Sequence, residues 1–207
     1  LGKGNIQYGH LWFVFHLFIY SIFFVSLSEI GIINKASTKL PFLNQYLLFA
    51  TVAVIAISSE LINIIYPQDR WINVLGLIPV EPYHLPQYLL MFFIGCIAGQ
   101  NSWFEKVSSQ LVNQWLGIGL FCAIFWYLIR YLQLYAQIEI INSNLLSFLY
   151  PLWEAFLCVG LSVGIFGFVY RKWNEFNSVW NKLAKATMGV YIIHFFIVIG
   201  FNYLLLD

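Results

Sequence analysis

Six long apolar segments follow one another along this chain of 207 residues, and none of them has more than one Asp, Glu, Lys or Arg. A helix that crosses a bilayer needs about 20 mainly apolar residues. The third segment is short unless His84 and Leu85 extend it or it continues past Gln100. The six predicted spans are Leu11–Ile30, Gln45–Tyr66, Pro86–Gln100, Trp115–Leu134, Leu145–Tyr170 and Thr187–Leu206.

The composition places these segments in lipid. Hydrophobic residues make up 61% of the chain and charged residues 9%, whereas soluble domains carry roughly 25% charged residues. A chain this poor in charge cannot cover a surface in water. We therefore predict an all-α fold, a polytopic integral-membrane helical bundle of about six transmembrane helices, with residues 1–207 forming one membrane domain.

The net charge of the chain argues against a nucleic-acid partner. It is +1, so the chain has no basic stripe that could neutralise nucleic-acid phosphates, and we expect no nucleic-acid partner. The three cysteines lie in apolar runs without metal-ligand spacing and predict packing rather than a metal or disulfide site; they are Cys96, Cys122 and Cys158. We expect no metal and no tightly bound cofactor.

Lys and Arg predict the orientation in a cell membrane. Seven of the ten fall in three of the connecting loops, and these loops, 31–44, 101–113 and 171–186, are predicted to be cytoplasmic. The other side has only Lys3, Arg70 and Arg130. Residues 67–85 then face outward, and within them the apolar segment Trp71–Val80, broken by Pro and Gly, predicts a re-entrant or interfacial element.

The fifth span has glycines at close intervals. Gly160, Gly164 and Gly167 are the kind of small residues that let membrane helices approach closely. This spacing predicts tight packing and carries no information on activity.

Two carboxylates inside spans need an explanation. Glu60 and Glu154 both lie toward the outer ends of their helices on the predicted topology. A carboxylate in lipid must be paired or protonated, and Arg70 and Arg130 are the outward-side cations available to it. Structural ion pairing accounts for Glu60. Glu154 is the better functional candidate, because Tyr150 and Trp153 flank it with aromatic surface that can also form hydrogen bonds.

Three histidines accompany these carboxylates. His10, with Trp12, marks the outer end of the first span, where interfacial anchoring competes with a functional role. His16 lies deeper, where it could simply bond to another helix. His194 follows Tyr191 by three residues on one helix face, roughly 10 Å into the membrane. It can be either a general base or an interior histidine that ties two helices together.

Four segments resemble a known family. The segments G-H-L-W-F-V-F-H-L (Gly9–Leu17), P-Q-Y-L-L-M-F-F-I-G-C-I-A (Pro86–Ala98), W-E-A-F-L-C-V-G-L-S-V-G (Trp153–Gly164) and L-A-K-A-T-M-G-V-Y-I-I-H (Leu183–His194) resemble, in this order, signatures of the acyltransferase-3 family and especially of its glucan-biosynthesis protein C branch. Thr187 stands where the last signature often has serine.

The resemblance implies an integral-membrane O-acyltransferase of bacterial type. Such an enzyme takes an acyl group, such as acetyl or succinyl, from acyl-CoA and transfers it to a hydroxyl of a carbohydrate or cell-envelope glycan. Family members have about ten helices with cytoplasmic ends, so we expect this chain to be an internal piece that lacks roughly three spans before Leu1 and one after Asp207. The family's Arg-rich opening and its catalytic histidine match no stretch here.

These implications give a site hypothesis. We expect His10, Glu154 and His194 as catalytic candidates. The expected substrate-binding residues are Trp12, Arg70, Tyr150, Trp153 and Tyr191. The alternatives are a proton-coupled transporter that uses Glu60, Glu154 and His194 as a relay, and a membrane scaffold without chemistry.

Overall fold

The computed structural model describes residues 12–33, 42–74, 78–135, 143–173 and 178–205, and most of them are helical. The elements are α1 (Trp12–Glu29), α3 (Gln45–Asn63), β1 (Ile72–Val74), β2 (Ile78–Val80), the 3-10 helix η2 (Pro82–His84), α4 (Leu85–Gln100), α5 (Trp103–Lys106), α6 (Ser109–Tyr135), α7 (Ser143–Trp173) and α8 (Ser178–Leu205). The predicted all-α, membrane-helical fold is confirmed.

One helix covers most of each predicted span. By length and composition, four helices of the described chain could cross a membrane: α1, α3, α6 and α7. Helix α4 has only 16 residues, which is short for a span. The number of six spans therefore stays a prediction. Helices α6 and α8 begin well before the apolar runs that predicted them, so two predicted loops, 101–113 and 171–186, are partly helical.

The outer faces of the helices are apolar. Phe18 on α1, Ile124 on α6 and Phe166 on α7 are 62%, 69% and 64% exposed. Large apolar side chains at such exposure suit a bundle whose solvent is lipid rather than water.

The segment predicted as re-entrant or interfacial is a small β-hairpin. Strands β1 and β2 pair antiparallel, with Ile72 opposite Val80 and Val74 opposite Ile78. The four β-branched residues favour strands, and Pro79 is tolerated because a two-stranded ribbon leaves one edge of each strand unpaired. The predicted irregular element is thus hydrogen-bonded within itself.

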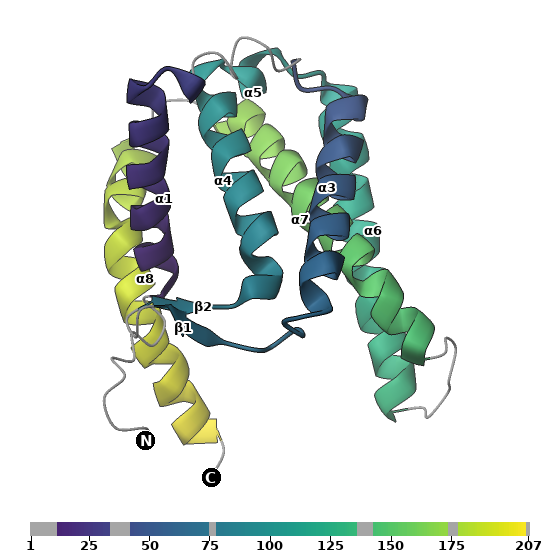
Figure 1. The fold of residues 1–207 in the computed structure, drawn as a ribbon. Coiled ribbons are helices and arrows are strands. Elements are labelled where there is room, and N and C mark those ends of the chain that lie inside the picture. The colour runs from purple at the N-terminus through teal and green to yellow at the C-terminus, as the bar shows by residue number, and fades with distance from the viewer. Residues whose placement is uncertain (1–11, 34–41, 75–77, 136–142, 174–177, 206–207) are drawn as a thin grey trace.

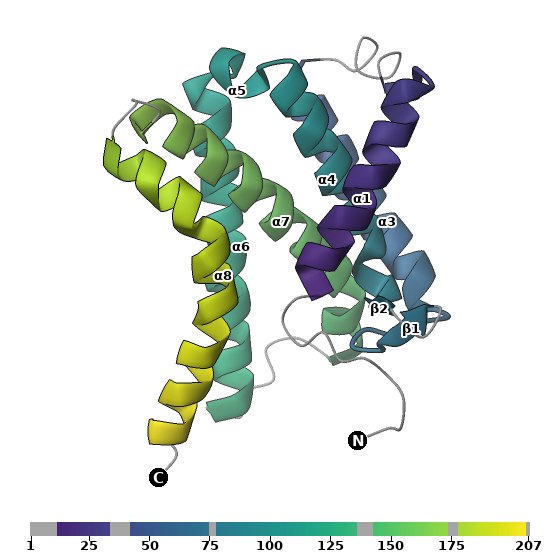
Figure 2. The ribbon, with the colours of Figure 1, turned by 90° about the vertical axis from the view of Figure 1, so that its left-hand side faces the viewer.

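The helices share two ends. We call the end with β1, β2 and η2 the hairpin end, and the end with α5 the α5 end (Figure 1). Figure 2, turned by 90°, shows the same two ends, with α7 crossing the bundle obliquely between them. Helix α1 runs from the hairpin end to the α5 end, and the later long helices alternate in direction (Figures 1 and 2).

Helices α6 and α7 pack along a glycine seam. A Cβ on Gly160 would lie 2.8 Å from the backbone nitrogen of Gly119, and one on Gly164 would lie 2.6 Å from Cα of Leu116. These distances leave no room for a side chain, so the predicted close helix approach occurs here.

The core lies where α3, α6 and α7 meet. Trp115 is fully buried, and its indole Nε1 donates to Gln45 Oε1 at 2.8 Å. Val52 and Val159, from α3 and α7, are also almost completely buried. A buried indole with a satisfied N–H fixes how α6 faces α3, which in turn fixes α7 and its glutamate.

Candidate functional site

A mostly buried group of one histidine and two glutamates lies at the hairpin end. His84 Nδ1 is 3.2 Å from Glu154 Oε1, and His84 Nε2 is 3.5 Å from Glu81 Oε1. The side chains of His84, Glu154 and Glu81 are 14%, 16% and 6% exposed. We call these three residues the His84 cluster. It joins the segment between β2 and α4 to the middle of α7.

Local sequence explains how His84 is held. Pro82 begins η2 and Pro86 lies in the first turn of α4, where a missing N–H costs nothing. The two prolines fix the backbone on either side of His84, the last residue of η2. The backbone N–H of His84 also donates to the carbonyl of Glu81 at 3.2 Å, which keeps both residues in one turn.

Burial sets the charge of the histidine. It lowers the pKa of His84 below the ordinary value, because the imidazolium loses hydration, while the Glu81 carboxylate opposes the change. The neighbouring Tyr83 is 1% exposed, and burial followed by the Glu154 carboxylate raises the pKa of its phenol. Tyr83 therefore stays a neutral hydroxyl beside the cluster at physiological pH.

Aromatic rings form the wall on the α6 side. The indole of Trp153 stacks on Trp126 with centroids 4.2 Å apart, and its Nε1 donates to the carbonyl of Cys122 at 2.7 Å. Tyr150 lies 5.3 Å from Trp153 and 6.4 Å from Tyr83, measured between ring centroids. Trp153 and Tyr150 were predicted to flank Glu154. The indole N–H of Trp153 is bonded to α6, whereas Tyr150 lies beside Tyr83, next to the cluster.

Trp12 of α1 lies one aromatic ring away from the cluster. Its ring lies 5.3 Å from Trp71 and 5.9 Å from Tyr88, and the Tyr88 ring lies 5.8 Å from His84. His16, one turn further along α1, donates from Nε2 to the carbonyl of Pro79 at 2.9 Å. The predicted bond of His16 to another helix is in fact a bond to the hairpin, which fastens α1 over this end of the bundle.

The predicted arginine partners of the two glutamates lie elsewhere. Arg70 is exposed, and its guanidinium lies 5.6 Å from the ring centroid of Tyr66. Glu154 pairs with His84 instead, and Glu60 accepts from Asn63 Nδ2 at 3.4 Å. The prediction failed because it considered only Lys and Arg as cations and overlooked the histidine before α4.

Helix α8 carries Tyr191 and His194 on its described part. The Tyr191 ring lies 6.5 Å from Phe13 of α1, so this residue faces the helix that bears Trp12. His194 is exposed, which does not fit the alternative of an interior histidine that ties two helices together, and its Nδ1 donates to the carbonyl of Tyr191. His10 lies outside the described residues.

A polar cavity of about 450 Å³ opens beside the aromatic wall. The loop after α3 contributes Asp69, α6 contributes Trp126 and Arg130, and α7 contributes Ser147 and Tyr150. Tyr150 therefore lies between this cavity and the His84 cluster. We call it the outer cavity.

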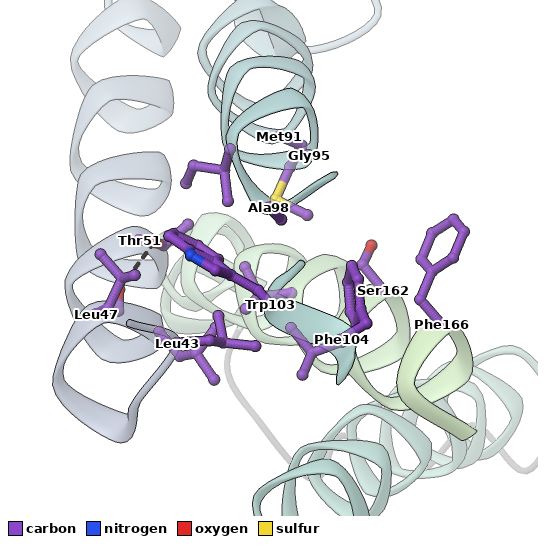
Figure 3. A pocket seen from close by; sticks show the side chains of 14 residues that line it. Leu43, Leu47, Thr51, Met91, Gly95, Ala98, Trp103, Phe104, Ser162 and Phe166 are labelled. Carbon is purple, nitrogen blue, oxygen red and sulfur yellow. Dashed lines mark hydrogen bonds between the residues drawn. The ribbon is translucent and has the colours of Figure 1, made fainter. Parts of the chain in front are cut away.

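A second pocket, of about 300 Å³, lies toward the α5 end and is almost entirely apolar. Helices α3, α4, α5 and α7 line it, and Figure 3 shows Met91, Trp103 and Phe104 turned into it. One of its polar side chains, Thr51, donates its hydroxyl proton to the carbonyl of Leu47 at 2.8 Å (Figure 3). This pocket suits a hydrophobic chain rather than a sugar or a nucleotide.

Sequence reasoning missed His84 and Glu81. The signal was E-P-Y-H at residues 81–84, on the same predicted side as Glu154 and directly before a span. Two ionisable residues next to two prolines, at the start of a predicted span, indicate a fixed polar site. In the part of the chain that the structure describes, no group of three or more His, Cys, Asp or Glu side chains is arranged so that it could hold a metal ion.

One comparison with known proteins gave a match. A family model described as an acyltransferase domain matches residues 3–207, almost the whole chain. No curated protein and no solved structure matches it.

Proposed function

The chain belongs to the acyltransferase-3 family and is a membrane O-acyltransferase, and on that premise we propose that it moves a small acyl group, such as acetyl or succinyl, from acyl-CoA to a hydroxyl of a carbohydrate. The observation that carries this proposal is the His84 cluster. It is a mostly buried group of ionisable side chains at one end of a largely apolar bundle.

The chemistry of acyl transfer needs such a group. Attack of an alcohol on a thioester requires a base that takes the hydroxyl proton as the new C–O bond forms, and the thiol leaves with a proton. An imidazolium between two carboxylates has the same net charge as a neutral imidazole between a carboxylate and a carboxylic acid. The lowered pKa of His84 favours the neutral imidazole, so the cluster can hold a neutral base at physiological pH.

The two cavities support opposite approaches of the substrates. The polar outer cavity at the hairpin end suits a hydroxylated acceptor. The apolar pocket toward the α5 end has no charged residue in its lining, so of the two acyl groups it suits the uncharged acetyl better than succinyl. The charge bias predicts that the α5 end is cytoplasmic, where acyl-CoA is available. We propose that His10, Trp12 and Arg70 serve the acceptor side, and that Tyr191 and His194 lie along the donor's route.

The experiment compares two glutamates at the same end of the bundle. Glu154→Gln keeps the shape of the side chain but removes its charge, and we expect acyl transfer from labelled acyl-CoA to fall by about a hundredfold or more in the intact protein. Glu60→Gln is the matched control, because Glu60 bonds to Asn63 outside the cluster, and it should keep full activity.

The same pair separates the alternatives. Equal activity of Glu154→Gln and wild type would remove the cluster from the reaction. A transporter that relays protons through Glu60 would instead show proton-coupled uptake in vesicles, lost in both variants, with no acylated product.

A further inference from the structure

The outer cavity is built from groups that suit an uncharged, hydroxyl-rich ligand. It holds one carboxylate, from Asp69, and one guanidinium, from Arg130, together with the amides of Gln68 and Gln133 and the hydroxyl of Ser147. A phosphate would need an excess of positive charge and a cation an excess of carboxylates, and neither is present in the lining. Balanced charges with amides and hydroxyls match the donors and acceptors of sugar hydroxyl groups.

Aromatic side chains complete this lining. Trp126 and Tyr150 present flat apolar surface, and each also carries a polar hydrogen. Trp126 is held by stacking on Trp153, and Tyr150 lies 5.2 Å from Trp126 between ring centroids. The aromatic part of the cavity is therefore fixed before any ligand enters, which reduces the ordering cost of binding.

Asp69 is held in an unusual backbone conformation. Its φ is +64°, in the left-handed region that non-glycine residues seldom adopt, although Asp and Asn tolerate it best. The backbone N–H of Asp69 donates to Glu81 Oε1 at 2.9 Å, and the same oxygen faces His84 Nε2. One carboxylate oxygen thus holds a residue of the outer cavity and a residue of the His84 cluster.

Helix α7 has an unusual backbone acceptor on a residue of the cavity lining. Pro151 lies inside this helix and has no N–H, so the carbonyl of Ser147, four residues earlier, lacks its usual helical donor. Ser147 lines the outer cavity and is itself exposed. The proline therefore leaves a backbone acceptor on a residue of this site rather than in lipid, where it would be costly.

We propose that the outer cavity is a binding subsite for a neutral sugar ring, next to the acceptor ring that is acylated at the His84 cluster. The inference rests on the proposed function, because it names where the acceptor extends. Tyr150 and Tyr83 separate the two places, so the acceptor that fits best has at least two linked sugars. The Glu81 carboxylate keeps both places in a fixed relation.

The test measures access to the cavity and does not depend on catalysis. Ser147→Cys is introduced into the intact protein in nanodiscs, and its labelling by a maleimide is followed above the background of the native cysteines. Cellobiose, maltose and chitobiose serve as probes, at concentrations well above millimolar. We expect at least one of them to slow labelling severalfold. Asn73→Cys, on an exposed hairpin position away from the cavity, is the control and should label at an unchanged rate.

A second substitution ties the protection to the cavity. Asp69→Asn preserves the left-handed backbone but removes the charge, and we expect the sugar concentration for half-protection to rise about tenfold or more. The proposal is overturned if Ser147→Cys does not label, if no disaccharide protects it, or if Asp69→Asn leaves protection unchanged. Protection without any acyl transfer by the wild type would uphold the subsite and contradict the proposed function instead.

Discussion

His84 is the residue on which the account depends most. It contacts Glu154 of α7 and Glu81 of the preceding turn, and in the described part of the chain no other ion pair joins this segment to α7. A buried imidazole can take a proton at neutral pH only while it is itself neutral. Its lowered pKa extends that neutral range toward acid.

The pH dependence of acyl transfer follows from this direction. Protonation of His84 removes the base, so kcat/KM should be level near neutral pH and should fall only below the ordinary histidine pKa of about 6.5. His84→Gln should lower kcat by about a hundredfold and abolish this acid limb. The pH–rate profile of the two proteins is the measurement. An acid limb above the ordinary value, or one that survives in His84→Gln, contradicts the role given to His84.

Among the elements, the α6–α7 pair determines where Glu154 lies. Its glycines bring the two backbones into contact, and a Cβ on Gly164 would clash with the main chain of Leu116 rather than with a flexible side-chain end. Gly117 of α6 has nothing within 4 Å of the corresponding position. A glycine-to-alanine substitution can therefore be compared at Gly164, where a side chain has no room, and at Gly117, where it has.

Gly164→Ala should destabilise the protein by roughly 1–3 kcal/mol, the usual cost of overpacking. Gly117→Ala should be neutral or slightly stabilising, because alanine favours a helix over glycine. Thermal unfolding of the purified variants in detergent is the readout. Equal unfolding temperatures for the two variants would show that the seam tolerates a side chain.

The long helices could be predicted from the sequence, but their exact starts and the short strands could not. Apolar runs predicted all the long helices, because a bilayer imposes one length and one kind of surface on each span. The apolar run predicted that the fourth span starts at Trp115, but α6 begins at Ser109. The hydroxyl of Ser108 caps this end of the helix by accepting from the N–H of Leu111. The strands of the hairpin could not be predicted, because each has only three residues, which is too short to show the alternation of apolar and polar residues typical of a strand.

The site was harder to predict than the fold. Glu154 could be singled out because a carboxylate in a span needs a partner, but the choice of partner depends on which residues tertiary packing brings together. Glu81 and His84 are about 70 positions away in sequence, and they become neighbours of Glu154 because η2 packs on α3, which in turn packs on α7. Sequence patterns carry no distance between segments this far apart.

The whole molecule is polarised between its two ends. The hairpin end has the His84 cluster and the outer cavity, and the apolar pocket lies toward the α5 end, with the described parts of the predicted cytoplasmic loops. This arrangement suits an enzyme that receives the donor on one side of the membrane and the acceptor on the other. The central claim is that transfer takes place at the hairpin end, at Glu154 and His84.

Sidedness of the reaction tests that claim most directly. The intact protein is placed in sealed vesicles in one orientation, with labelled acyl-CoA only on the α5 side and the carbohydrate acceptor only on the hairpin side. We predict acylated acceptor in the hairpin-side compartment for wild type and for Glu60→Gln, and essentially none for Glu154→Gln. Product that forms only when donor and acceptor share one compartment, or that forms equally with Glu154→Gln, would contradict the account.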